Sequence, residues 1–184
     1  MTLAGGGGQA EQRGVSASGG MRVFGLAGWS GSGKTTLLTA LVPLLTARGL
    51  SVSTVKHAHH EFDIDRPGKD SWRHREAGAH EVMIASSRRW ALMHELRGMQ
   101  EPSLDELAAR MTPVDLLLVE GFKTHPHPKI EVHRPALGKP LLYLDDPHVF
   151  ALACDEPVAA PIPVLPLGEP AGIAALILDR FGGL

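Results

Sequence analysis

Residues 28–35 read Gly28-Trp29-Ser30-Gly31-Ser32-Gly33-Lys34-Thr35, a glycine-rich run that ends on a lysine and a hydroxyl side chain. The run fits the pattern G-x-x-x-x-G-K-[ST] at every fixed position, which is the pattern of a phosphate-binding loop, or P-loop. Glycines let the backbone turn tightly and bring its N–H groups against phosphate oxygens without side-chain clashes. Lys34 places a positive charge near the β- and γ-phosphates of a nucleoside triphosphate, and Thr35 offers a hydroxyl to Mg²⁺.

The sequence on either side of this loop supplies the strand and the helix that a P-loop requires. Residues 21–27 (MRVFGLA) form a short apolar run that predicts a buried strand. Leucine and alanine then recur at helical spacing from residue 35 to residue 48, with Pro43 expected to kink the helix. The residues expected to bind the nucleotide phosphates are Gly28, Ser30, Gly31, Ser32, Gly33, Lys34, Thr35 and Thr36.

The remaining chain alternates between strand and helix patterns. Further strands are expected at residues 51–56, 81–85, 89–93, 114–119, 129–133, 149–153 and 162–165. Helices are expected at residues 70–77, with Asp70 as N-cap, at 103–110 and at 171–181. This order predicts an α/β protein with a P-loop NTPase-like three-layer fold and a largely parallel central sheet.

Length and composition favour one folded domain and give no bulk argument for a polyanionic partner. The chain has 184 residues and a formal net charge of −2, so neither nucleic acid nor a membrane surface is expected to bind it. No apolar run approaches the roughly 20 residues that span a bilayer. Residues 1–20, which contain four consecutive glycines, are expected to be a disordered tail, and residues 21–184 a P-loop nucleotide-binding domain. The single cysteine, Cys154, fits a reducing cytoplasm.

A P-loop also requires a carboxylate on the Mg²⁺ side, at the end of a neighbouring buried strand. Asp115 and Glu120 flank the almost continuously apolar run at residues 116–119. Ligands collect at the carboxyl ends of parallel strands, which favours Glu120 over Asp115. We therefore expect Thr35 and Glu120 to lie on the metal side and Asp115 to be structural.

A polar block at residues 57–80 holds five of the ten histidines together with several aspartates and basic residues. We interpret it as a loop over the phosphates, in which Lys69 and Arg73, with Arg75, contact the anion. Asp63 or Asp65 then contacts Mg²⁺ through water. Two alternatives stay open, namely a zinc site built on His57, His59 and His60 and an ordinary solvated helix face.

Several segments together resemble the molybdopterin-guanine dinucleotide biosynthesis adaptor family, MobB. They are GWSGSGKTTL at residues 28–37, VKHAHHEFDIDRPGKDSWRHREAGA at 55–79, HELRG at 94–98, VDLLLVEGFK at 114–123 and PKIEVHR at 128–134. The resemblance implies a GTP-binding accessory protein in the last step of molybdenum cofactor maturation, where a partner guanylyltransferase joins GMP to molybdopterin. It also implies at most a weak GTPase and a homodimer, and leaves open whether molybdopterin itself contacts this chain.

Guanine recognition needs a residue of its own, because the chain contains no Asn-Lys-x-Asp motif. Guanine presents the N1–H and N2–H₂ donors side by side, and a carboxylate can accept from both. Asp155 follows the expected strand at residues 149–153 and is the candidate base-binding residue, against the alternative of an Asp-Glu-Pro surface turn.

Two other functions share part of this pattern. A uridine-kinase-like small-molecule kinase has a similar loop, although it also needs an arginine-bearing lid and a carboxylate base for the acceptor hydroxyl. A stand-alone regulatory GTPase is the other alternative. Release of ADP only with an acceptor substrate would indicate the kinase, and nucleotide-dependent affinity for an effector would indicate the switch.

Overall fold

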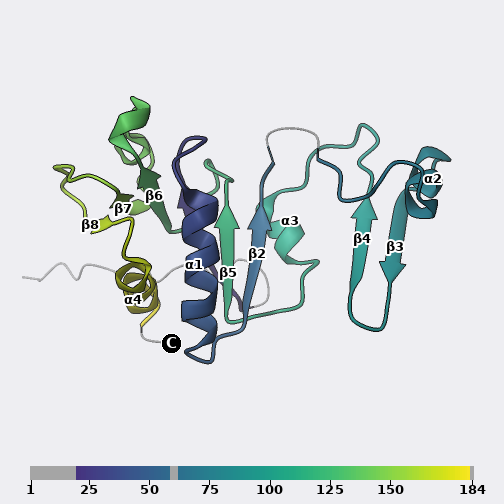
Figure 1. Ribbon diagram of the computed structural model, residues 1–184, viewed down its shortest axis with the longest axis horizontal. Coiled ribbons are helices and arrows are strands. Elements are labelled where there is room, and N and C mark those ends of the chain that lie inside the picture. The colour runs from purple at the N-terminus through teal and green to yellow at the C-terminus, as the bar shows by residue number, and fades with distance from the viewer. Residues whose placement is uncertain (1–19, 59–61, 183–184) are drawn as a thin grey trace, which may run out of the picture. The chain divides into compact units, whose positions relative to one another are not determined.

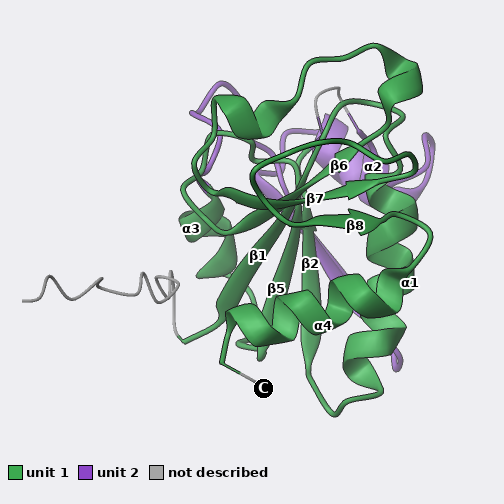
Figure 2. Ribbon diagram, turned by 90° about the vertical axis from the view of Figure 1, so that its left-hand side faces the viewer, with its two compact units in different colours: residues 1–57, 104–184 green, residues 58–103 purple. Residues whose placement is uncertain are grey.

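The computed structural model describes residues 20–58 and 62–182 of the chain (Figure 1). The tail expected at residues 1–20 therefore lies outside the described residues, except for Gly20. The chain divides into two compact units, one of residues 1–57 and 104–184 and one of residues 58–103 (Figure 2). The single domain expected over residues 21–184 stays a prediction.

The first unit is built on a six-stranded sheet with the order β2-β5-β1-β6-β7-β8, in which all neighbouring strands are parallel. Its strands are β1 (Arg22–Ala27), β2 (Val52–Lys56), β5 (Leu116–Glu120), β6 (Lys129–His133), β7 (Val149–Cys154) and β8 (Val164–Pro166). The largely parallel sheet predicted from the sequence is confirmed, and each strand lies within a few residues of its expected place.

Helices cover both faces of this sheet, as Figure 2 shows. Successive side chains of β5 point to opposite faces of the sheet. Leu118 packs against α1 (Lys34–Thr46) and α4 (Pro170–Arg180) on one face. Leu117 packs against α3 (Leu104–Ala108) on the other face. The strand expected to be covered on both faces is therefore fully buried, and the three-layer fold is confirmed. Among the described residues, no helix combines the length and apolar character needed to cross a membrane.

Two charged side chains lie buried on β6, where the sequence analysis expected only a strand. Lys129, which is 1% exposed, donates hydrogen bonds to Asp146 Oδ2 at 2.6 Å and to the carbonyl of Lys123 at 2.7 Å. Glu131 is 0% exposed and accepts hydrogen bonds from the backbone N–H groups of Leu142 and Tyr143. These partners compensate for burying the charges, and they fix the loops before and after β6 to the sheet.

The second unit contains α2 (Asp70–Glu76) and an antiparallel hairpin of β3 (Glu81–Ala85) and β4 (Trp90–His94). The strands and the helix were expected, but Asp70 as N-cap is wrong. Lys69 occupies the cap position and Asp70 is the first helical residue, where its carboxylate still suits the positive end of the helix. Two short 3-10 helices, η1 (Pro135–Leu137) and η2 (Leu142–Leu144), belong to the first unit.

Cys154 gives a chemical test of this fold because it ends the buried strand β7 and is 3% exposed. Burial, with the nearby charges of Glu131 and Asp155, raises the pKa of its thiol to about 11. The thiolate is the reactive form, so we expect the native protein to react with a thiol reagent at pH 8 about 100-fold more slowly than the protein unfolded in guanidinium. Absorbance of the released chromophore measures both rates. Equal rates would show that Cys154 is exposed and that β7 is not in the core.

Candidate nucleotide-binding site

The P-loop begins where β1 leaves the sheet, and its glycines are required by the backbone. Gly28 has φ +143°, and a Cβ at this position would collide with the carbonyl oxygen of Val132 on β6. Gly31 and Gly33 have φ +79° and +101°, values that L side chains rarely adopt. The loop expected from the sequence therefore has the backbone that only glycine tolerates at these three positions.

Lys34 folds back over the loop from the first turn of α1. Its ammonium group donates hydrogen bonds to the carbonyls of Gly28 at 2.9 Å and Trp29 at 2.8 Å. The side chain thus reaches from the end of the loop back to its first two residues.

The charge of Lys34 is unfavourably placed in the protein alone. Burial lowers the pKa of its ammonium group, the carboxylate of Glu120 raises it, and the positive charges of Lys123 and Lys56 lower it further. The net direction is downward, so the charged form of Lys34 is destabilised. An anion bound in the loop would favour that charged form, which suits a phosphate site.

Thr35 and Glu120, which the sequence predicts on the metal side, contact each other at the carboxyl end of β5. Thr35 Oγ1 lies 2.8 Å from Glu120 Oε1 and 3.1 Å from Oε2, and Glu120 is 7% exposed at the end of β5. Two adjacent oxygen ligands of this kind fit Mg²⁺, which prefers hard oxygen donors. Asp115 lies before the start of β5 and accepts hydrogen bonds from Ser51, consistent with its expected structural role.

Lys56, which the sequence analysis did not identify, lies beside this pair. Strand register places it opposite Glu120, and its Nζ lies 3.4 Å from Glu120 Oε1 and 3.5 Å from Thr35 Oγ1. The residue is the last of β2, so the rule that ligands collect at carboxyl ends of parallel strands could have found it.

A cavity of about 400 Å³ adjoins the loop on the side of the first turns of α1. Its lining residues are Gly33, Thr36, Leu37, Ala40, Arg134, Asp155, Leu167, Gly168 and Pro170. The fold thus brings the candidate base-binding residue Asp155 to the same cavity as Gly33 and Thr36 of the expected phosphate site. The parallel order of β1, β6 and β7 produces this proximity, because their carboxyl ends share one edge of the sheet.

Arg134 links the cavity to the loop and was also missed by the sequence analysis. Its Nε donates a hydrogen bond to the carbonyl of Ser32 at 3.0 Å, and its Nη1 lies 3.5 Å from Asp155 Oδ2. Arg134 directly follows β6, so its place at the sheet edge was available from the predicted strand. The contacts of Arg134 with Ser32 and Asp155 could not be predicted, since both residues lie far from it in the sequence.

The other expected contacts, Asp63, Lys69 and Arg73, belong to the second unit. Asp63 accepts a hydrogen bond from Arg75 Nη2 at 2.7 Å, which lowers the pKa of its carboxyl group. Arg73 is exposed and 4.0 Å from Asp70. Asp63, Lys69 and Arg73 stay predictions as nucleotide or Mg²⁺ ligands.

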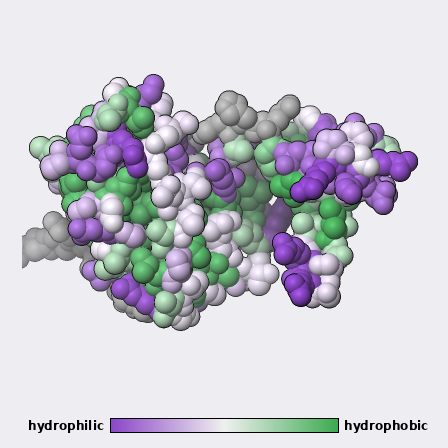
Figure 3. Space-filling model, in the orientation of Figure 1, coloured by the Kyte–Doolittle hydropathy of each residue, from purple (hydrophilic) through white to green (hydrophobic). Residues whose placement is uncertain are grey.

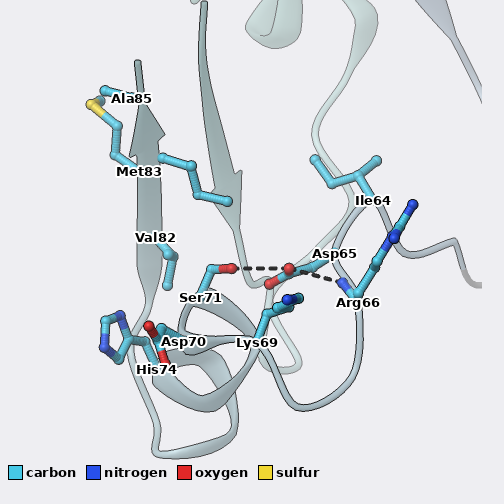
Figure 4. Close-up of a pocket in the computed structure, with 11 residues that line it drawn as sticks. Ile64, Asp65, Arg66, Lys69, Asp70, Ser71, His74, Val82, Met83 and Ala85 are labelled. Carbon is cyan, nitrogen blue, oxygen red and sulfur yellow. Dashed lines mark hydrogen bonds between the residues drawn. The ribbon is translucent and has the colours of Figure 1, made fainter.

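Lys69 lines a second cavity, of about 550 Å³, within this unit (Figure 4). Asp65 also lines this cavity, and its carboxylate accepts a hydrogen bond from Ser71 Oγ at 2.9 Å, drawn as a dashed line in Figure 4. The zinc alternative involves His59 and His60, which lie outside the described residues. In the part of the chain that is described, no group of three acidic, histidine or cysteine side chains is placed to hold a metal ion.

The parallel sheet, the glycine-defined loop and the Thr35–Glu120 pair define a P-loop protein of the α/β class with a nucleotide-binding domain. The family model MobB, described as "Molybdopterin guanine dinucleotide synthesis protein B", matches residues 23–155. The chain therefore belongs to the MobB family. This membership confirms the resemblance noted in the sequence and disfavours the uridine-kinase-like interpretation.

Similar proteins agree with this assignment over most of their length. The chain is 44% identical to the molybdopterin-guanine dinucleotide biosynthesis adapter protein of Escherichia coli, with 83% of this chain and 89% of that protein covered. It is 45% identical to the adapter protein of Haemophilus influenzae, covering 88% and 92%. A crystal structure of "molybdopterin-guanine biosynthesis protein B (mobB)" matches with a TM-score of 0.67 and 30% identity, covering 85% of this chain and 98% of that one.

The Thr35–Glu120 pair predicts how the affinity for nucleotide depends on Mg²⁺. We expect Glu120→Gln to leave metal-free binding nearly unchanged and to reduce the Mg²⁺-dependent gain in affinity by roughly ten- to a hundred-fold, since a charged hydrogen-bond partner contributes about 1.5–3 kcal/mol. Titration of fluorescent GTP with and without Mg²⁺ measures the gain. Asp115→Asn is the matched control, because it removes the same charge at the other end of β5. The same Mg²⁺ dependence in Glu120→Gln and wild type would exclude Glu120 from the metal side.

Proposed function

We propose that this chain is a GTP-binding adapter that assists the guanylyltransferase which joins GMP to molybdopterin. Family membership supports the biosynthetic step. The observation that carries the GTP assignment is the placement of Asp155 in the cavity that also contains Gly33 and Thr36. One nucleotide could therefore place its base in this cavity and its phosphates in the adjoining loop.

The chemistry of Asp155 favours guanine over adenine. Its carboxylate presents two acceptor oxygens, which match the adjacent N1–H and N2–H₂ donors of guanine, whereas adenine presents an acceptor at N1. Arg134 lies 3.5 Å from Asp155 Oδ2 and holds the carboxylate beside the cavity. Because the side chain of Asp155 is 33% exposed, part of the expected discrimination is screened by water.

Mg²⁺ completes the proposed nucleotide site. Thr35 and Glu120 would hold it, and the ion would neutralise charge on the β- and γ-phosphates. Lys34, with the backbone and side chains of residues 28–36, would hold the phosphates themselves. Asp63, Lys69 and Arg73 are further proposed ligands of Mg²⁺ or the phosphates, which the concentration of charge in the second unit supports. The proposed hydrolysis of GTP by this site is at most weak.

A homodimer is part of the proposal, and the β3–β4 hairpin supports it. A two-stranded sheet is marginally stable by itself and leaves unpaired edges. Met83 and Trp90 are 62% and 65% exposed on this hairpin, and Ile84 and Leu92 are 44% and 43% exposed. Figure 3 shows apolar side chains over the hairpin, between hydrophilic surfaces. Burial of these side chains against a second copy would offset their exposure.

Since GTP is drawn from the cytoplasmic pool, we propose the cytoplasm as the compartment.

Asp155→Asn tests the guanine assignment. The amide presents one acceptor and one mismatched donor, so we expect the preference for GTP over ATP to fall by roughly ten-fold. Competition against a fluorescent nucleotide measures both affinities. Glu156→Gln is the matched control, because it removes the same charge from the adjacent exposed residue. An unchanged preference in Asp155→Asn would exclude Asp155 as the base-binding residue, and a wild type without preference would exclude guanine specificity altogether.

Reconstitution with purified molybdopterin, GTP and Mg²⁺ tests the adapter role. We expect this chain alone to form no dinucleotide and to raise the yield of the guanylyltransferase several-fold when GTP is limiting. Dinucleotide formed by this chain alone would make it a transferase. Absence of stimulation at every GTP concentration would contradict the adapter role.

A further inference from the structure

Lysine is concentrated around the P-loop. The chain has six lysines, and four of them, Lys34, Lys56, Lys123 and Lys139, lie at or beside the loop. A P-loop uses one lysine for its phosphates, which is Lys34 here. Lys56 is paired with Glu120 at 3.4 Å. Lys123 and Lys139 are therefore the two ammonium groups without a role in the nucleotide site described above.

Both of these lysines lie over the ring of Trp29, the second residue of the loop. The Nζ atoms of Lys123 and Lys139 are 4.7 Å and 5.7 Å from the ring centroid. The indole N–H of Trp29 donates a hydrogen bond to the carbonyl of Pro140 at 2.8 Å, which fixes the ring beside the segment that carries Lys139. Two loops more than ten residues apart in the sequence thus bring ammonium groups to one aromatic side chain.

Buried polar groups hold both loops in place from the sheet side. Lys129 donates a hydrogen bond to the carbonyl of Lys123 at 2.7 Å, so the backbone at residue 123 is tied to a side chain that is 1% exposed. Glu131 accepts hydrogen bonds from the N–H groups of Leu142 and Tyr143 at 2.9 Å and 3.0 Å, close after Lys139. The backbone near both lysines is therefore anchored to the sheet.

The positive charge at this place has no ion-pair partner among residues 20–58 and 62–182. Among the ion pairs of the described residues, neither Lys123 nor Lys139 has a carboxylate within 4.0 Å. The attraction of Trp29 for a cation offsets part of their repulsion, by about 0.5–1 kcal/mol at an exposed site. Like charges held together by a rigid support are stabilised most by an anion placed between them.

We propose that Lys123, Lys139 and Trp29 form a second phosphate site beside the P-loop, and that it takes a phosphate monoester. Lysine binds such a dianion as a point charge, without the fixed geometry that arginine would impose. The proposed function identifies the monoester. A dinucleotide contains two linked phosphates, and GMP supplies only one, so the acceptor must bring the other as a phosphate monoester. That acceptor is molybdopterin, and only this identification rests on the proposed function.

The first test uses inorganic phosphate on protein saturated with Mg²⁺ and a non-hydrolysable GTP analogue. We expect a saturable change in tryptophan emission that is absent in Trp29→Phe, which retains Trp72 and Trp90 as background. Lys123→Gln and Lys139→Gln should each weaken phosphate binding by roughly five- to ten-fold and keep the affinity for the GTP analogue within about two-fold of wild type. Arg48→Gln, which removes a charge at the far end of α1, is the control and should change neither affinity.

Three outcomes would overturn the second site. The first is no saturable response of the nucleotide-loaded wild type to phosphate. The second is a parallel loss of phosphate and nucleotide affinity in both lysine variants, which would assign them to the triphosphate. The third is an equal loss in Arg48→Gln, which would reduce the effect to overall charge.

A second arm compares molybdopterin with dephosphorylated molybdopterin on the same proteins. We expect only the phosphorylated form to bind, and Lys123→Gln and Lys139→Gln to weaken it as they weaken phosphate. Equal binding of both forms would overturn the pterin assignment. The binding measurement can be separated from the test of the adapter role. Molybdopterin that binds without any stimulation of the guanylyltransferase would contradict the proposed function but would leave the second phosphate site in place.

Discussion

The carbonyl oxygen of Val132 lies too close to residue 28 for a Cβ to fit between them, and this close approach sets the geometry on which the rest of the site depends. Parallel pairing holds β6 against β1, so the backbone of one strand reaches the point where the chain leaves the other. Only glycine permits that approach with φ +143°. The loop leads directly into α1, whose first two residues, Lys34 and Thr35, contact the loop carbonyls and Glu120. A larger residue at position 28 would displace either β6 or the loop.

Strand β6 has a second role, since it carries charges into the core to fix the loops around the site. Lys129 and Glu131 lie almost fully buried and are compensated by Asp146 and by backbone groups of the neighbouring segments. Buried ion pairs contribute little net stability against apolar replacements, but breaking one is costly. Their value here is positional. They hold the segments before and after β6 beside Trp29, and Arg134, the next residue after the strand, joins the loop to the cavity of Asp155.

The two compact units have different physical characters. The first has a continuous apolar core on both faces of its sheet, with residues such as Phe24 and Leu117 fully buried. The second is held by its hairpin and by charged contacts, in which Arg75 pairs with Asp63 and Glu95. A small unit with exposed apolar side chains is better suited to association than to independent stability. The P-loop, the Thr35–Glu120 pair and the cavity of Asp155 all belong to the first unit.

Local pattern was sufficient to predict nearly every strand and helix, the P-loop and the place of Glu120 at the carboxyl end of β5. Those features depend on residues close in the sequence and on the rule that parallel strands end at one edge of the sheet. The same rule could have pointed to Lys56 and Arg134 as residues at that edge, but it could not have found what Lys56, Arg134, Lys123 and Lys139 contact. Their partners are Glu120, Ser32, Asp155 and Trp29, up to about a hundred residues away, and only the order of strands in the sheet brings them together. The sequence therefore specifies which side chains can bind phosphate, because that ability is a property of each residue. The folded sheet specifies which of them lie close enough to share a ligand, because hydrogen bonds and direct ion pairs act over only a few ångströms.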